Sequence, residues 1–136
     1  MYKSILVPID MAHLDEWKST LEAAATLGGG HADITLLNVV EDIPNWAAVE
    51  LPRGIREKSL QDSKEELGTI ASSASTDIKV EVRAGHPYKT ILEVAEEKNV
   101  DLIIITSHKP DLQDYFLGST AAKVVRHARC SVLVIR

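Results

Sequence analysis

The sequence predicts an α/β fold in which four helices sandwich a five-stranded, parallel, doubly wound sheet. Short apolar runs alternate with segments that carry the 3- and 4-residue spacing of amphipathic helices, in the order βαβαβαβαβ. The first and fourth runs are nearly unbroken in apolar residues, which is typical of strands covered on both faces. A single domain over residues 1–136 is expected, because this length suits one hydrophobic core.

In the first half of the chain, a strand, a helix, a second strand, a loop and a second helix are expected. Their ranges are Lys3–Ile9, His13–Leu27, Ala32–Val40, Asp42–Gly54 and Ile55–Ser73. Glycines 28–30 end the first helix. The side chains expected to face the core are Leu14, Trp17, Leu21, Ala24 and Ala25 in the first helix, and Leu60, Leu67, Ile70 and Ala71 in the second.

The second half begins with Ile78–Ala84, where apolar and charged residues alternate, which indicates a strand with one wetter face near a sheet edge. Gly85-His86-Pro87 opens the third helix, with Pro87 near its first position. The remaining ranges are Asp101–Ile105 for a strand, Ala121–His127 for the last helix and Ser131–Ile135 for the last strand.

Composition narrows the classes of function. The formal net charge of −5 argues against a nucleic-acid partner, because such proteins usually present a basic face. Cys130 is the only cysteine, so no internal disulfide can form and a cytoplasmic location is expected. No apolar run has the length of a membrane helix, and the apolar start of the chain is too short for a signal peptide and is cut by Pro8.

The strongest functional indication is the polar stretch from Thr106 to Thr120, between the fourth strand and the last helix. A helix start favours phosphate, because it offers unpaired backbone N–H groups and a partial positive charge. Gly118 would let the backbone approach a ligand, and Ser119 would add a hydroxyl donor. If strand 1 lies between strands 2 and 4, this stretch meets the ends of those strands in one crevice.

Six fragments, in this order along the chain, resemble the universal stress protein family. They are Ile5–Asp10, Leu36–Val40, Gly85–Pro87, Asp101–Ile104, Leu117–Ser119 and Cys130–Arg136, so that the resemblance spans Lys3–Arg136. It implies an adenine nucleotide alpha hydrolase-like α/β domain, which binds ATP in many members. It also implies a homodimer, or a higher oligomer, paired through the apolar edge formed by Val132, Leu133, Val134 and Ile135.

The family's nucleotide loop, Gly-x2-Gly-x9-Gly-Ser/Thr, is only partly kept. Thr106 and Lys109 stand where its first two glycines are expected, and eight residues rather than nine separate Lys109 from Gly118. Gly118-Ser119 matches in full. The segment with Lys109 and Pro110 resembles the universal stress protein F-like branch, which still includes nucleotide binders.

Carried over by position, the resemblance implies a site for ATP with Mg²⁺. Pro8 and Ile9 would form one side of an adenine slot, and Val39 would offer backbone hydrogen bonds to the adenine edge. Asp10 would lie near the ribose or hold Mg²⁺, since carboxylate oxygens suit both. The residues implied at the phosphates are Thr106, Ser107, His108, Lys109, Gly118, Ser119 and Thr120.

Each of these residues also has a structural interpretation. Asp10 would equally cap the first helix, and Gly118-Ser119 would equally be an ordinary helix start. Lys109 would equally be solvated, and His108 would equally tether its loop. Trp46, in the long loop, favours packing or a partner contact over stacking on a base.

The expected function is that of an ATP-binding regulatory dimer in the stress response, in which nucleotide orders the loop Lys109–Leu117. Two alternatives stay open. A nucleotide-free dimeric adaptor is favoured by Thr106 and Lys109, and a slow ATPase or autophosphorylating protein is the second. No residue pair is placed as nucleophile and base, so the residues do not indicate dedicated catalysis.

Overall fold

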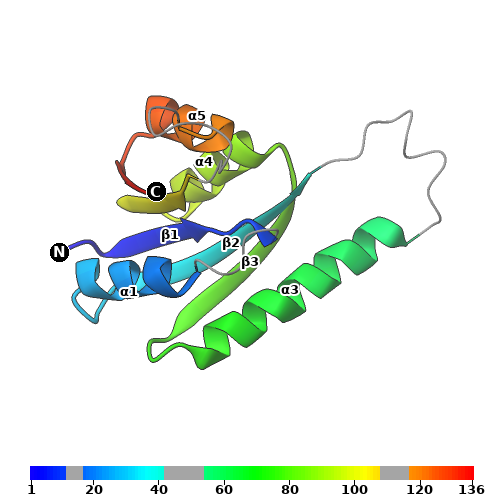
Figure 1. The fold of residues 1–136 in the computed structure, drawn as a ribbon, viewed down its shortest axis with the longest axis horizontal. Helices are drawn as coiled ribbons and strands as arrows, with labels where there is room; N and C mark the ends of the chain where they lie inside the picture. Colours follow the sequence, from blue (N-terminus) through cyan, green and yellow to red (C-terminus); the bar gives the residue numbers. More distant parts are fainter. Residues whose placement is uncertain (12–16, 42–53, 108–116) are drawn as a thin grey trace.

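A computed structural model describes residues 1–11, 17–41, 54–107 and 117–136 (Figure 1). In these ranges the strands are β1 (Ser4–Pro8), β2 (Asp33–Glu41), β3 (Ile78–Gly85), β4 (Leu102–Thr106) and β5 (Ser131–Ile135). The helices are α1 (Trp17–Leu27), α3 (Ile55–Ser73), α4 (Pro87–Glu97) and α5 (Ser119–His127). None of these described helices is long and apolar enough to cross a membrane.

The strands form one parallel sheet in the order β3-β2-β1-β4-β5. The predicted fold class is therefore confirmed, together with the placement of β1 between β2 and β4. The alternating sequence of β3 predicted a strand at a sheet edge, and β3 is an edge strand. Because the chain winds outward from β1 first in one direction and then in the other, the first two helices, α1 and α3, lie on one face of the sheet and α4 and α5 lie on the other.

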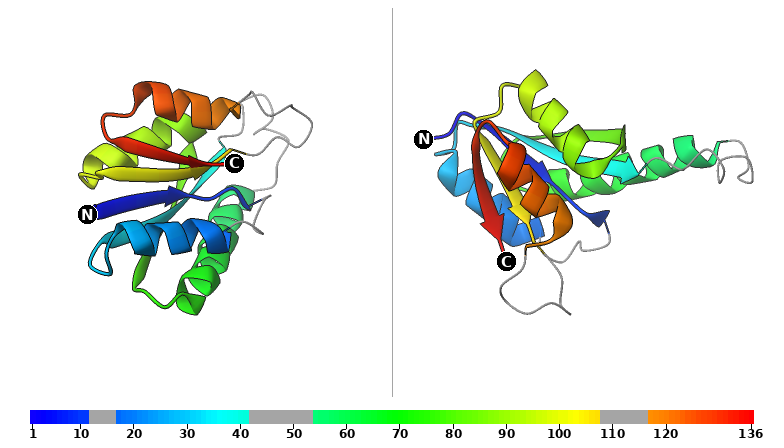
Figure 2. Two further views of the ribbon diagram at one scale, coloured as in Figure 1. Left: turned by 60° about the vertical axis from the view of Figure 1, so that its left-hand side comes forward. Right: turned by 90° about the horizontal axis from the view of Figure 1, so that it is seen from above.

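Two helices cover each face of the sheet (Figures 1 and 2). Ile5 and Val7 of β1 pack in one core cluster with α1 and α3, whereas Leu6 packs in a second cluster with α4 and α5. β4 alternates in the same way, with Leu102 and Ile104 on one side and Ile103 and Ile105 on the other. Both faces of the central strands are therefore buried, as their apolar sequences predicted.

The buried stripes of the helices match the sequence prediction in part. Leu21, Ala24, Leu67 and Ile70 are buried, and the half-buried Trp17 and Ala71 pack against the same core cluster. Ala25 and Leu60 are half-buried and pack against neither core cluster, which corrects the expectation that these two residues face the core. Leu60 is only half-buried because α3 packs against β3 and β2 with its C-terminal half, while its first turns extend past the sheet (Figure 1). The expected core residue Leu14 lies outside the described residues.

A network of charged side chains covers the outer corner of the sheet beside α4. Arg83 donates from Nε to Glu81 and from Nη1 to Glu97, at 2.9 Å in both cases. Lys98 Nζ lies 3.2 Å from the second Glu81 carboxylate oxygen. The hydrogen bond from Arg83 lowers the pKa of Glu97, and hydrogen bonds to Glu97 and Glu81 raise the pKa of Arg83 further above its ordinary value. Ion pairs thus cover the part of β3 that faces the α4 layer.

Asp101 fixes the start of β1 against the start of β4. Its carboxylate accepts hydrogen bonds from the backbone N–H groups of Lys3 and Ser4, each at 2.9 Å, and its own N–H donates to Ser4 O at 3.0 Å. Partial burial opposes ionisation of Asp101, but the two backbone hydrogen bonds outweigh it and hold the pKa of this carboxyl below its usual value. The ionised form therefore stabilises the fold.

Replacing this carboxylate tests its contribution. We expect Asp101→Asn to lower the free energy of unfolding by about 1–2 kcal/mol at pH 7, because an amide accepts less well and carries no charge. A depressed folded-state pKa adds stability above the unfolded pKa of about 4 and loses it as pH falls through the folded value. The difference between wild type and variant should therefore shrink below about pH 4. Denaturant titrations at several pH values measure the difference in unfolding free energy, with Asp77→Asn, at an exposed position, as the control. A difference that does not depend on pH would contradict the stabilising role of the Asp101 carboxylate.

Gly85, the last residue of β3, has φ of 155° and precedes α4. A Cβ added there would lie 2.5 Å from the hydroxyl of buried Thr90. We expect Gly85→Ala to destabilise the protein by about 1–3 kcal/mol, since backbone strain and a clash add.

Gly68, in the exposed face of α3, provides the matched control. A Cβ at this position meets nothing within 4 Å. Gly68→Ala should therefore stabilise the protein by about 0.5–1 kcal/mol, because alanine is the better helix former. Thermal unfolding measures the change in stability of both variants. A change of the same sign in Gly85→Ala and Gly68→Ala would contradict the backbone strain and the close contact with Thr90 assigned to Gly85.

Candidate functional site

A cavity of about 400 Å³ lies at the carboxyl ends of β1, β2 and β4, beside the first residues of α4 and α5. Of the eleven residues that the sequence predicted to bind nucleotide, nine line it. These are Pro8, Ile9, Asp10, Val39, Thr106, Ser107, Gly118, Ser119 and Thr120. The other two, His108 and Lys109, lie outside the described residues, as does Trp46. The fold thus brings together residues that come from four separate parts of the chain.

The wall formed by Pro8, Ile9 and Asp10 is held in place by β2. Ile9 N–H donates to Leu37 O at 2.8 Å, which is the last backbone contact between the two chain segments. The buried Asn38 side chain then donates from Nδ2 to Ile9 O at 3.0 Å. Because Asn38 takes the place of a further backbone bond, β1 turns away from β2 at this point and the cavity opens.

Val39 presents backbone groups to this opening. Leu37 directs its peptide groups toward β1, and in a strand the residue two positions further directs its groups to the same side. The N–H and C=O of Val39 therefore face the space beyond the end of β1, where no strand continues. One donor and one acceptor lie side by side at the wall of the cavity.

The start of α5 forms the opposite wall. The sequence assigned Ala121–His127 to the last helix and Gly118-Ser119 to its start, and α5 begins at Ser119, with Gly118 as its N-cap. Gly118 has non-helical angles (φ −57°, ψ 153°), and its carbonyl already accepts from Ala122 N–H at 2.9 Å. Ser119, Thr120 and Ala121 all line the cavity, and their N–H groups have no partner within the helix.

Ser107 connects this helix start to the sheet. Its hydroxyl oxygen accepts from Gly118 N–H at 2.7 Å, and its own N–H donates to Ile135 O, at the end of β5, at 2.8 Å. The two ends of the segment between β4 and α5 are therefore joined directly by one short hydrogen bond. This fixes the helix N-terminus, with its partial positive charge, against the end of β4.

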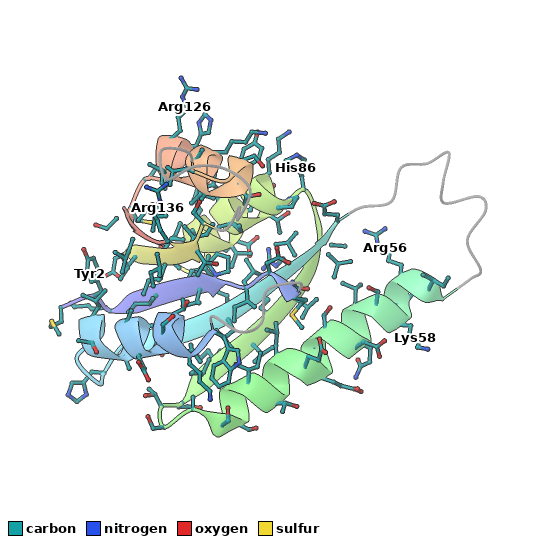
Figure 3. The ribbon with its side chains drawn as sticks, in the orientation of Figure 1. Tyr2, Arg56, Lys58, His86, Arg126 and Arg136 are labelled. Atoms are coloured by element: carbon teal, nitrogen blue, oxygen red, sulfur yellow. The ribbon has the colours of Figure 1, made fainter. Side chains whose placement is uncertain are left out.

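The charges at the cavity are unevenly distributed. Asp10 and Glu41 are the carboxylates among the described lining residues, which include no Lys or Arg. Arg126, near the end of α5, points away from the sheet, and Arg56 and Lys58 lie on the first turns of α3 (Figure 3). Within the described residues, positive potential at the cavity therefore comes from the N-termini of α4 and α5, which both lie beside it.

Magnesium fits this donor set as part of a ligand complex. No group of three or more His, Cys, Asp or Glu side chains that could hold a metal occurs within the ranges that the structure describes. Mg²⁺ commonly binds through one or two carboxylates plus substrate phosphates and water. Asp10, at the end of β1, supplies one carboxylate at the cavity.

Seven lining residues were absent from the predicted set, namely Leu37, Asn38, Glu41, Pro87, Ile91, Ile105 and Ala121. A period-2 pattern around Val39 would have indicated Leu37 and Glu41, since they share its face of β2. Pro87 and Ile91 carry no such signal, because the contact between the start of α4 and the cavity depends on how the helix packs.

A second cavity, of about 380 Å³, lies at the opposite end of the sheet, between the C-terminal ends of α4 and α5. Cys130 and His127 line it, and Arg129 and Glu96 form an ion pair at 3.2 Å beside it. Cys130 is half-buried against the α4/α5 core cluster, and burial raises the pKa of its thiol. This agrees with its interpretation as a packed small side chain.

Comparison with known proteins gives a consistent result. The sequence matches the profile described as the universal stress protein family over residues 1–136. Universal stress protein G of Shigella flexneri is 34% identical over 145 residues, covering 100% of both chains.

Solved structures share the fold. The structure of hypothetical protein MJ0577 superimposes with a TM-score of 0.81 at 26% identity, covering 99% of this chain and 96% of that one. A universal stress protein solved in complex with cAMP has a TM-score of 0.70 at 18% identity, covering 99% and 97%; at this identity the likeness concerns the fold alone. The F-like branch indicated by the loop sequence stays a prediction.

Proposed function

Because this chain belongs to the universal stress protein family, we propose that it binds ATP with Mg²⁺ in the cavity at the ends of β1, β2 and β4. Occupancy of the site would alter the surface that the protein presents to partners. The protein would act in this way as a nucleotide-dependent regulatory homodimer in the stress response. Its single cysteine supports a cytoplasmic location.

The observation that carries the proposal is the convergence of the α5 start and the free edge of β2 on one cavity. Backbone N–H groups of Ser119, Thr120 and Ala121 suit phosphate oxygens, because anions are stabilised at a helix N-terminus. Opposite them, Val39 offers a donor and an acceptor, which match the N1 and the 6-amino group of adenine. Pro8 and Ile9 supply an apolar wall for the base.

Asp10 would complete the site between base and phosphates. Its carboxylate can accept hydrogen bonds from ribose hydroxyls or hold Mg²⁺ bound to the phosphates. His108 and Lys109 are proposed to reach the phosphates from the segment after β4. A neighbour of the same fold was solved in complex with cAMP, which is consistent with a proposed adenine nucleotide ligand.

The proposed dimer would form through β5, whose outer edge pairs with no other described strand. Val132 to Ile135 are all half-buried, with Leu133 and Ile135 against one core cluster and Val132 and Val134 against the other. An apolar edge of this kind invites pairing with a second copy across a two-fold axis.

Titration calorimetry with Mg-ATP tests the site, with Gly118→Val as the variant. We expect valine to abolish measurable binding, because its branched side chain would stand between the helix start and the phosphates. The fold should stay intact, since φ of −57° suits any residue and the first added carbon meets only Ser107 Oγ, at 3.6 Å.

Two outcomes of the titration would contradict the proposal. Unchanged affinity in Gly118→Val, with an unchanged circular dichroism spectrum, would place the phosphates elsewhere. No heat with wild type at millimolar Mg-ATP would remove the binding proposal and favour the nucleotide-free adaptor.

Light scattering tests the assembly, and the expected mass is about twice the 14.9 kDa of one chain.

The direction of the peptide groups of β5 suggests the variant. Ser107 N–H donates to Ile135 O, so Ile135 and Leu133 direct their peptide groups toward β4, whereas Val134 directs its groups outward. Val134→Pro should therefore yield a folded monomer, because proline removes only an outward N–H. Leu133→Pro, which removes a β4–β5 hydrogen bond, should unfold the protein and serves as control. A monomeric wild type at micromolar concentration contradicts the dimer.

A further inference from the structure

Glu41, the last residue of β2, lines the cavity beside Val39 and lay outside the set of residues expected from the sequence. Val39 packs against the core cluster of α4 and α5, and successive residues of a strand alternate between faces. Glu41, two positions further, therefore lies on the same face of β2 as Val39. Its register partner on β3 is Gly85, which has no side chain, so no side chain of β3 lies beside Glu41 at this register position.

The order of the backbone N–H and C=O groups along β2 decides which part of a bound base lies next to Glu41. Along a strand the carbonyl of a residue lies nearer the C-terminus than its N–H. A base that accepts from Val39 N–H and donates to Val39 C=O therefore places its donor on the side of Glu41. In adenine that donor is the 6-amino group, which has two hydrogens. Val39 C=O can accept only one of them in this arrangement.

We propose that Glu41 is a specificity-determining residue that accepts the second hydrogen of the 6-amino group, so that the site selects 6-aminopurine over 6-oxopurine nucleotides. This rests on the proposed function of the cavity. A carboxylate is an acceptor and cannot donate, so it attracts an amino group and repels the oxygen of a 6-oxopurine. No ion pair joins Glu41 to another residue in the described part of the chain.

The other carboxylate at the cavity does not serve this purpose. Asp10 follows the end of β1, on the far side of the opening from Glu41, and already interacts with its surroundings. Asn38 is committed to Ile9 O through its amide nitrogen. Glu41 is thus the side chain on β2 that can distinguish the two classes of purine.

The test compares ATP with ITP, which has an oxo group in place of the 6-amino group and a hydrogen on N1. The Val39 backbone, which also distinguishes the two bases, is the same in every variant, so a change in the ratio of the two dissociation constants reports on the side chain. Dissociation constants for both magnesium complexes are measured by calorimetry for wild type, Glu41→Gln and Glu93→Gln. Glu93 is exposed on α4 and outside the cavity, so its variant makes the same change in net charge. We expect wild type and Glu93→Gln to prefer ATP equally, and Glu41→Gln to reduce the ratio of the two constants about tenfold.

The outcomes separate this proposal from the one on which it rests. Binding of ATP with an unchanged ratio in Glu41→Gln overturns the role of Glu41 and leaves the proposed function standing. An equal loss of affinity for both nucleotides would mean that Glu41 acts on the phosphates or on Mg²⁺, which also overturns it. Absence of binding of either nucleotide to wild type overturns both proposals.

Discussion

The candidate site depends on one mismatch in length: β2 continues where β1 stops. Both strands begin side by side, and their hydrogen bonds continue as far as Ile9 N–H and Leu37 O. The buried amide of Asn38 then satisfies Ile9 O, which would otherwise call for a further backbone donor. A buried carbonyl without a partner would cost about 1–3 kcal/mol, so this side chain makes the early end of β1 tolerable. The peptide groups of Val39 are exposed to the cavity as a consequence.

The wall of the site formed by α5 depends on Ser107, whose hydrogen bonds connect the end of β4 with β5 and with the start of α5. Its backbone N–H extends the pairing of β4 with β5, and its hydroxyl accepts from the N-cap of α5. If a ligand displaced Gly118, the displacement would therefore pass through Ser107 to the hydrogen bond at Ile135 O, in the strand proposed to form the dimer. The proposed nucleotide site and the proposed interface are linked by two consecutive hydrogen bonds, Gly118 N–H to Ser107 Oγ and Ser107 N–H to Ile135 O.

The sequence was sufficient for the fold because each face of the sheet is encoded locally. Runs such as Leu102–Ile105 are short and continuously apolar, which is typical of a strand buried on both sides, and in the structure this run alternates between the two core clusters. It was also sufficient for most of the candidate site, because strand ends and the Gly118-Ser119 helix start are recognisable in the sequence. The contact of Gly118 with Ser107, by contrast, could not be predicted, because it depends on tertiary structure. Trp17 and Leu60 fit helical stripes, yet the extent of their burial depends on how far each helix overlaps the sheet.

Glu41 illustrates a different limit. A carboxylate at the end of a strand has no distinctive pattern, and in an acidic chain it is most simply taken as a solvated residue. Its importance arises only when the register of β2 against β1 and β3 is known, because this register places it beside the free edge of Val39 and opposite Gly85. A negative side chain close to a site proposed for an anion is unfavourable, unless its charge acts on a part of the ligand that donates hydrogen bonds. At the distal end of β2, across the cavity from α5, Glu41 lies where the base rather than the phosphates would be.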